Sequence, residues 1–416
     1  METNVVYGMY SGLALLMDVY YPEEANGHGV ILIRGSAWHA PLSYGAWQLK
    51  EPAPGVIRAA LLDAGYTVFV INHRAAPRFR YPAAVEDAQR AVRFIRHHAD
   101  RFGINPERMG GVGGSSGGHL VAMLGTLDGT GDPSDPDPVN RESAKLQCVV
   151  AASAALDFPS WPSMWSREVL GSFLGTVRFV DPEIYQEASP SNHVSADDAA
   201  FLLVHGEADE AVPIQQAEVM LAALEGAGVK VKLLRVPGGD HGLRPANAEG
   251  APNHRGEMIR WLNLHLLGEA APEEAERLVA ALGLVAKGEN LARERKVEAA
   301  IRAYAEAQET YPALTIVAQS WNQLCWQGSL WGYAAEVMPA CEQAVALAPD
   351  NGNIRDSRGL ARALTGDLAG AIQDFQAFVA FTQNERARAQ RQEWIDALRE
   401  GRNPFTPEVL EKLRGD

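Results

Sequence analysis

A run of glycines and serines at residues 111–118, Gly-Val-Gly-Gly-Ser-Ser-Gly-Gly, constrains the fold of this chain most. A Gly-x-Ser-x-Gly pattern after an apolar stretch predicts a sharp turn from a strand into a helix, with the serine at its tip. Glycines are needed there because a Cβ would collide with neighbouring backbone. Two registers fit, with Ser115 or Ser116 as a nucleophile, and we prefer Ser115 because Val112 then helps to finish the strand. A tight turn without chemistry is the alternative.

The first 268 residues alternate between apolar runs and amphipathic segments. The runs predict strands at Val30–Ile33, Thr67–Ile71, Met109–Gly113, Leu146–Ala152, Phe201–His205 and Val229–Val236. Apolar residues at helical spacing predict helices at Val85–His97 and Glu218–Leu224. Continuous apolar strands that alternate with helices are typical of an α/β fold, in which helices flank a mostly parallel central sheet. Residues 1–268 are therefore expected to form one domain.

The charge balance argues against some classes of partner. The chain has 416 residues, with 37 Lys and Arg against 52 Asp and Glu, which gives a formal net charge of −15. Such a chain has no overall attraction for nucleic acid or an anionic membrane surface, so neither is expected as a partner.

The sequence also gives expectations for the compartment. No apolar run reaches the roughly 18 residues of a membrane span, and residues 1–18 lack the basic start of a secretory signal. Cys148, Cys325 and Cys341 are too few and scattered for a disulfide framework or a zinc site, so we expect a cytoplasmic protein in a reducing compartment.

Beyond residue 268 the strand pattern ends, and residues 269–280 are expected to be a linker or the start of a helix. Small and larger residues then recur at equal offsets, at Gly288, Ala300 and Tyr304, at Cys325, Val337 and Cys341, and at Gly359, Ala371 and Phe375. The second and third sets are 34 residues apart. This period predicts stacked helix pairs at 281–314, 318–351 and 352–385, followed by capping helices. Pro339 should kink or shorten the second helix of the middle pair.

The period and its small and aromatic positions resemble tetratricopeptide (TPR) repeats. Trp321 and Leu324 also lie where the first helix of that family carries Trp and Leu. The resemblance implies an all-α TPR-like helical repeat domain at 281–416, which would bind a protein partner or self-associate. A generic helical bundle is the alternative.

A nucleophilic serine needs a base, and the base needs an acid that orients it. Asp209 follows one predicted strand and His241 follows the next. Both loops leave the C-terminal edge of the sheet, where ligands bind in open α/β folds. Ser115, Asp209 and His241 are therefore the predicted catalytic residues. Asp240 would orient His241 poorly because adjacent side chains seldom face each other, and Asp157 is a further candidate.

Six motifs along residues 5–268 point to one family. They are Met17-Asp-Val-Tyr-Tyr-Pro22, Asn72-His-Arg-Ala-Ala-Pro77, Tyr81-Pro-Ala-Ala-Val-Glu-Asp87, the Ser-Ser-Gly-Gly-His-Leu elbow, His205-Gly-Glu-Ala-Asp209 and Gly239-Asp-His241-Gly. With them the chain resembles α/β-hydrolase esterases of the bacterial acetyl-esterase and hormone-sensitive-lipase-like, BD-FAE type. The resemblance implies a small-molecule substrate, a short-chain acyl ester, with carbohydrate acetyl or feruloyl esters as natural substrates. No metal or other cofactor is expected.

The family usually carries His-Gly-Gly-x-Trp after its third strand, where this chain has Arg34-Gly-Ser36-Ala37-Trp38. The resemblance implies that the amides of Ser36, Ala37 and Ser116 stabilise the oxyanion of a tetrahedral intermediate. A serine at position 36 carries a strain cost if its backbone needs a positive φ. Arg34 would anchor the loop or meet an anionic group of the substrate.

Residues 158–190, between two predicted core strands, are expected to form a cap over the site. The aromatic residues expected to line an acyl or alcohol pocket are Trp38, Trp161 and Trp165, with Phe173, Phe179, Tyr44 and Trp47 nearby. Ordinary packing of the cap is the alternative.

These features together predict a serine carboxylesterase with a C-terminal repeat domain. The same three residues would also serve an amide hydrolase, such as a formamidase or a peptidase. A different class is a TPR interaction protein whose hydrolase domain is weakly active. The altered loop at 34–38 favours that class, and the complete set of Ser, Asp and His argues against it.

Overall fold

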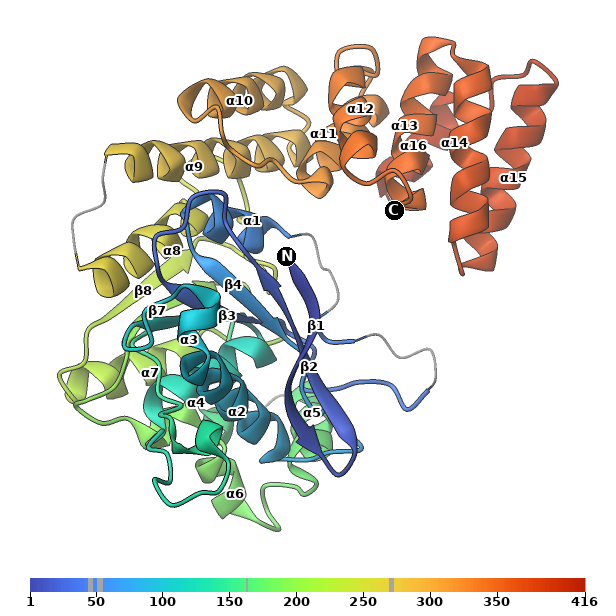
Figure 1. The fold of residues 1–416 in the computed structure, drawn as a ribbon. Coiled ribbons are helices and arrows are strands. Elements are labelled where there is room, and N and C mark those ends of the chain that lie inside the picture. The colour runs from blue at the N-terminus through green and yellow to red at the C-terminus, as the bar shows by residue number, and fades with distance from the viewer. Residues whose placement is uncertain (44–47, 51–54, 162–163, 269–272, 416) are drawn as a thin grey trace. The chain divides into compact units, whose positions relative to one another are not determined.

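The computed structural model describes residues 1–43, 48–50, 55–161, 164–268 and 273–415 (Figure 1). The chain divides into two compact units. The first comprises Met1–Ala53, Ala60–Ala246 and Ala251–Val279, and the second comprises Pro54–Ala59, Asn247–Gly250 and Ala280–Asp416. Among the described helices, none is both long and apolar enough to cross a membrane.

The first unit contains an eight-stranded sheet in the order β1-β2-β4-β3-β5-β6-β7-β8. Its strands are β1 Glu2–Tyr10, β2 Leu13–Tyr20, β3 Gly29–Ile33, β4 Thr67–Ile71, β5 Met109–Gly114, β6 Cys148–Ala152, β7 Ala200–Gly206 and β8 Val231–Val236. Strands β3 to β8 run parallel, while β1 and β2 form a hairpin that joins β4 antiparallel. The sequence predicted the six parallel strands. It did not predict the hairpin, because β1 is a largely exposed edge strand without a continuous apolar run.

Helices cover both faces of this sheet. Those of the first part of the chain are α1 Val56–Asp63, α2 Ala83–His97, α3 Ala99–Phe102, α4 Ser116–Thr126, α5 Met164–Leu174, α6 Pro182–Glu187, α7 Gln215–Gly226 and α8 His254–Leu262. Successive residues of a strand point to opposite faces. A Cβ at Gly110 in β5 would lie 3.0 Å from Leu262 of α8, and one at Gly111 would lie 3.2 Å from Val121 of α4. Helices α8 and α4 therefore pack on opposite faces of β5.

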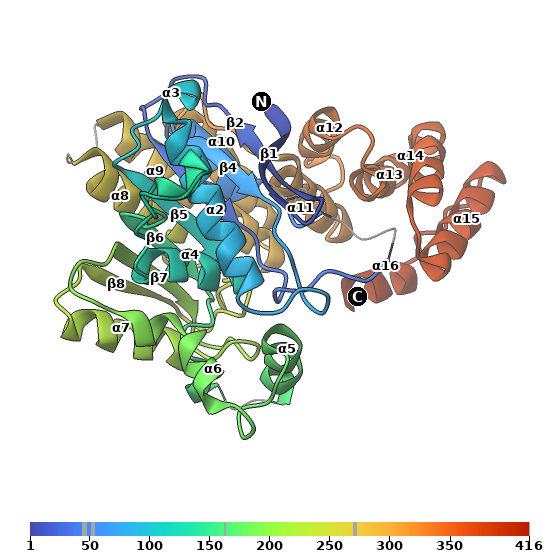
Figure 2. The same ribbon diagram turned by 60° about the horizontal axis from the view of Figure 1, so that its bottom comes forward.

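The predicted cap segment contains α5 and α6 and lies between β6 and β7 in the chain. It packs on α4 through the buried ring of His119, whose Nε2 is 2.8 Å from the Ala188 carbonyl oxygen. Figure 2 shows α5 and α6 together below the sheet.

The remaining helices are α9 Glu273–Arg293, α10 Val297–Thr310, α11 Ala318–Leu330, α12 Met338–Leu347, α13 Gly352–Thr365, α14 Leu368–Phe381, α15 Glu385–Arg399 and α16 Pro407–Gly415. Helix α12 has Pro339 in its first turn and contains 10 residues, where α10 and α14 contain 14. Proline is tolerated there because the first-turn N–H groups have no intrahelical acceptor. Helix α12 is thus shorter than its counterparts, as predicted, but Pro339 lies at its start and not inside it.

The repeated small and aromatic positions meet inside the helix pairs. A Cβ added at Gly288 would lie 2.6 Å from the Tyr304 ring, and one at Gly359 would lie 2.9 Å from the Phe375 ring. At the corresponding place in the middle pair, Cys325 and Cys341 form a disulfide. The interpretation of the cysteines as too few and scattered for disulfides is therefore wrong for this pair, and their number no longer supports a reducing compartment.

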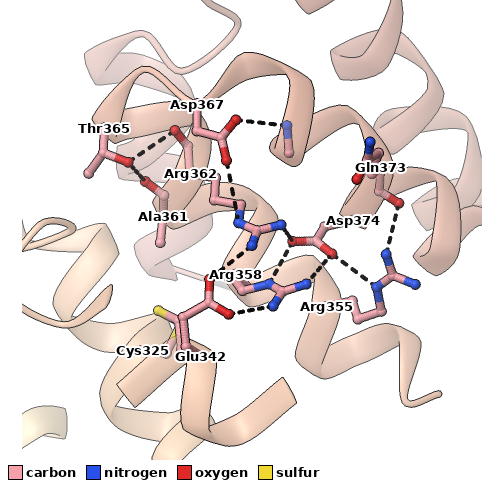
Figure 3. Close-up of polar contacts among 12 residues, drawn as sticks. Cys325, Glu342, Arg355, Arg358, Ala361, Arg362, Thr365, Asp367, Gln373 and Asp374 are labelled. Atoms are coloured by element: carbon pink, nitrogen blue, oxygen red, sulfur yellow. Dashed lines mark hydrogen bonds and ion pairs between the residues drawn. A yellow bond between two sulfur atoms is a disulfide. The ribbon is translucent and has the colours of Figure 1, made fainter. Parts of the chain in front are cut away.

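A cluster of charged side chains joins α12, α13 and α14 (Figure 3). The side chain of Asp374 in α14 is fully buried. Its carboxylate oxygens form ion pairs with the guanidinium nitrogens of Arg355, Arg358 and Arg362 at 2.9, 2.8 and 3.0 Å. Glu342 of α12 pairs with Arg358 and Arg362 at 2.6 and 2.9 Å. The three arginines recur at intervals of three and four residues, so they share one face of α13.

Candidate active site

The glycine-rich run forms the predicted turn between β5 and α4. Ser115 has φ 53° and ψ −124°, and α4 begins at Ser116. A Cβ at Gly113 would lie 2.3 Å from the Gly117 carbonyl oxygen, and one at Gly117 would lie 2.1 Å from the Ile33 carbonyl oxygen. Glycine is required at both positions because these contacts are with backbone, which cannot give way. Ser115 lies at the tip of the turn, and Ser116 lies inside the helix.

The structure brings the three predicted catalytic side chains together. His241 Nε2 lies 3.1 Å from Ser115 Oγ, and His241 Nδ1 lies 2.8 Å from Asp209 Oδ2. The three residues follow β5, β7 and β8, so they meet at the C-terminal edge of the parallel sheet. A neutral imidazole with its proton on Nδ1 donates to Asp209 and accepts the Ser115 hydroxyl proton at Nε2.

Asp209 is held by its own loop and by a second histidine. Its Oδ1 accepts the N–H groups of Ala211 and Val212 at 3.0 and 2.8 Å. His205 Nε2 lies 2.7 Å from the Val212 carbonyl oxygen and 3.4 Å from Asp209 Oδ2. Burial raises the pKa of Asp209, but hydrogen bonds from His205, His241 and the Val212 N–H outweigh it and lower that pKa below its ordinary value. Asp209 is therefore an anion in hydrogen-bond contact with His241 Nδ1.

His205 was part of a motif in the sequence, but its position gave no sign that its side chain contacts Asp209.

The two other candidate acids have different partners. Asp240 binds the Arg244 guanidinium at 2.8 Å, and Asp157 accepts the hydroxyl of Ser191 at 2.8 Å. Both carboxylates therefore contact residues other than His241.

The predicted oxyanion loop packs against the turn. A Cβ at Gly35 would lie 2.8 Å from the Gly114 carbonyl oxygen and 2.9 Å from Ser115 Cβ. The positive φ values in this loop fall at Ala37 (53°) and Trp38 (55°). The Ser36 N–H donates to Ser116 Oγ at 2.8 Å, so this predicted oxyanion donor is already engaged. The Ser116 amide is in the first turn of α4, where N–H groups lack intrahelical acceptors.

The aromatic residues predicted to line a pocket pack inside the protein where they are described. Trp38 is 2 % exposed, stacks on Phe173 at 4.5 Å and donates its indole N–H to His119 Nδ1 at 3.1 Å. Trp161 is buried and donates to the Ala211 carbonyl oxygen at 3.2 Å. These contacts favour ordinary packing over a lining role. Tyr44, Trp47 and the side chain of Trp165 lie outside the described residues, and Phe179 is 88 % exposed.

A pocket of about 690 Å³ lies elsewhere on the same edge of the sheet. Residues 72–75 and 78–79 after β4, residues 40–43 and 48–49, and Leu13 line it. Ala40 is three residues beyond Ala37, so this wall starts within about 11 Å of the oxyanion loop. The sequence did not reveal the pocket, because its lining comes from segments that only the fold brings together.

The first part of the chain is similar in sequence to known esterases. Residues 17–224, half of the chain, match the BD-FAE family model. The chain is 28% identical to esterase LipQ of Mycobacterium tuberculosis over 203 residues, which cover 47% of this chain and 48% of LipQ. It is 28% identical to esterase LipC of the same organism over 250 residues, 58% of this chain and 59% of LipC. The chain thus spans about half the length of the curated relatives it matches.

A solved structure described as a truncated form of a carbohydrate esterase from gut microbiota superposes with a TM-score of 0.54 at 28% identity, covering 64% of this chain and 95% of that one. The Est2 esterase of Thermogutta terrifontis superposes with a TM-score of 0.51 at 22% identity, covering 65% of this chain and 94% of that one. The α/β-hydrolase fold predicted for the first part of the chain is confirmed.

Proposed function

This chain belongs to the BD-FAE family, and we propose that it is a serine carboxylesterase that hydrolyses short-chain acyl esters through an acyl-enzyme. The observation that carries the proposal is the hydrogen-bond chain from Ser115 through His241 to Asp209, with links of 3.1 and 2.8 Å. Its position at the C-terminal edge of the sheet agrees with where α/β folds bind ligands. Carbohydrate acetyl and feruloyl esters are the natural substrates we propose.

The chemistry follows from the roles of the three side chains. Ser115 Oγ attacks the ester carbonyl while His241 Nε2 takes its proton, and Asp209 stabilises the imidazolium that forms. The amides of Ala37 and Ser116 donate to the oxyanion, and the Ser36 amide would have to share its proton with Ser116 Oγ. His241 then protonates the leaving alcohol, and water deacylates Ser115 by the same steps in reverse.

A series of 4-nitrophenyl esters with two, four and eight acyl carbons tests this proposal. We expect the acetyl and butyryl esters to be the best substrates, and the S115A variant to lose at least about a thousandfold in kcat, as removal of a catalytic nucleophile does elsewhere. Wild-type turnover equal to that of S115A would refute the esterase. Faster hydrolysis of 4-nitroacetanilide than of 4-nitrophenyl acetate would point to an amide hydrolase instead.

We also propose that the helices of residues 281–416 form a TPR-like stack that binds a protein partner or a second copy of the chain. The contacts of Gly288 with Tyr304 and of Gly359 with Phe375 support a shared repeat. Sedimentation of the full chain between 1 and 100 µM tests self-association. A constant monomer mass would exclude a second copy as the partner.

A further inference from the structure

The second serine of the turn makes a bond that the triad does not use. Ser116 is 2 % exposed, and its Oγ accepts the Ser36 N–H at 2.8 Å across 80 residues of sequence. Ser36 belongs to the loop after β3, and Ser116 begins α4. One side chain therefore joins the two segments that carry the proposed oxyanion donors.

The loop that Ser116 holds has an unfavourable backbone. Ala37 and Trp38 both lie in the left-handed region, at φ 53° and 55°. A residue other than glycine is strained in this region, so the conformation persists only where other contacts hold it. The bond from the Ser36 N–H to Ser116 Oγ helps to fix this loop on the side of the nucleophile.

The far end of the loop is fastened separately. The Trp38 carbonyl oxygen accepts the Ala76 N–H at 2.8 Å, and the Ala40 N–H donates to the Ala76 carbonyl oxygen at 2.9 Å. These bonds fix the loop after the two strained residues, and the bond to Ser116 fixes it before them. The Ser36 carbonyl oxygen also accepts the His39 N–H at 3.0 Å, so Ser36 closes the turn that contains Ala37. Without the Ser116 hydroxyl, this turn would lose the side-chain bond that ties Ser36 to α4.

We propose that Ser116 is a positioning residue, whose hydroxyl holds the loop at 34–38 so that the Ala37 amide points at the oxyanion. The proposal rests on the proposed esterase function. Complete loss of an oxyanion donor costs about 10²–10³ in kcat. Because S116A loosens a donor and keeps its own amide, we expect a smaller loss, on the order of tenfold to a hundredfold.

The test compares S116A with wild type and with S189A. Ser189 is a matched control because it is also buried and its Oγ accepts a distant backbone N–H, that of Phe158, at 2.9 Å. With 4-nitrophenyl acetate, S116A should lose tenfold or more in kcat with KM changed less than threefold. Its Ki for a trifluoromethyl ketone, which forms a tetrahedral oxyanion on Ser115, should rise by the same factor. S189A should change neither, at temperatures where all three proteins are folded.

Amide hydrogen exchange of residues 34–39 measures the bond from the Ser36 N–H to Ser116 Oγ independently of catalytic activity. We expect exchange at Ser36 to be about fivefold faster in S116A, as loss of a bond worth about 1 kcal/mol implies. An inactive wild type would refute the esterase, and the exchange rates would still decide whether Ser116 holds the loop. Unchanged exchange in S116A, or equal losses of kcat in S116A and S189A, would overturn the proposal.

Discussion

Two buried aspartates show how differently the two units use a carboxylate. The side chains of Asp209 and Asp374 are both 0 % exposed. Asp209 is bound by two backbone amides and two histidines, and Asp374 is bound by three arginines. The two carboxylates are equally buried, but the groups that bind them differ in chemistry.

The difference lies in what the partners can do next. A guanidinium keeps its proton at any ordinary pH, so the cluster around Asp374 can only hold α12, α13 and α14 together. An imidazole passes a proton through its second nitrogen, and His241 presents that nitrogen to Ser115. A buried carboxylate thus points to chemistry only where a partner can release a proton.

The largest expected effect separates the two aspartates by activity. D209N keeps the shape of the side chain but removes the anion that fixes the His241 tautomer. We expect kcat for 4-nitrophenyl acetate to fall by about 10⁴, as for the equivalent change in another serine hydrolase. Circular dichroism should show a folded protein. Activity above a tenth of wild type would show that Asp209 does not orient His241.

D374N is expected to lower stability and to leave kcat unchanged, the opposite of D209N. The substitution leaves three guanidinium groups around a neutral amide. Breaking a buried ionic cluster by removing one partner costs about 3–5 kcal/mol. Urea unfolding of the full chain should show this loss in a transition of the helical unit, with kcat unchanged below that transition. The control is E342Q, because Glu342 is 48 % exposed and its pairs should be worth less than about 1 kcal/mol. Equal stability of D374N and wild type would mean that the cluster is not structural.

The disulfide gives the next largest effect within the helical unit. It closes a segment with a sequence separation of 16 residues, and loops of that length contribute about 3 kcal/mol. C325A/C341A should lose that amount in urea unfolding, and dithiothreitol should then have no effect. The matched variant is C325G/C341Y, which installs the glycine and tyrosine of the first helix pair and should recover part of the loss. A loss in C325A/C341A that dithiothreitol does not reproduce in wild type would contradict this account.

Much of the first unit could be predicted from the sequence because single residue types carried the signal. Continuous apolar runs marked the parallel strands, and Gly113 and Gly117 marked the turn because backbone lies within 2.4 Å of a Cβ there. Ser115, Asp209 and His241 could be predicted as a set because each follows a different predicted strand of the sheet. In each case a local pattern corresponded to one position in the fold.

The features that sequence did not reveal depend on pairs of distant residues. The Ser36 amide meets Ser116 across 80 residues, and nothing in either segment specifies the other. The cluster on Asp374 likewise needs three helices to be placed first. The disulfide is an intermediate case, because the repeat had already aligned Cys325 with Gly288 and Cys341 with Tyr304, a pair in contact.

A third buried side chain sharpens the comparison by having no carboxylate partner. His119 of α4 is 0 % exposed, accepts the Trp38 indole N–H at Nδ1 and donates from Nε2 to the Ala188 carbonyl oxygen. Burial lowers its pKa from 6.5 to about 4. The two ring nitrogens of His119 therefore face neutral groups, whereas His241 Nδ1 faces the carboxylate of Asp209.

This shift predicts how stability depends on pH. Between pH 6.5 and about 4 the unfolded chain binds a proton at His119 that the folded chain excludes, so the contribution is complete above pH 6.5 and is lost as pH falls toward 4. At 1.36 kcal/mol per pKa unit, the complete loss is about 3–4 kcal/mol, and about 2–3 kcal/mol of it has occurred at pH 4.5. The free energy of unfolding should be measured in urea at pH 7.5, 5.5 and 4.5 for wild type and H119Q, which cannot be protonated. Buried His73, whose pKa burial also lowers, is present in both proteins, so the difference between their slopes isolates His119. Equal slopes would mean that the folded chain accepts the proton at His119 and that burial beside Trp38 does not exclude it.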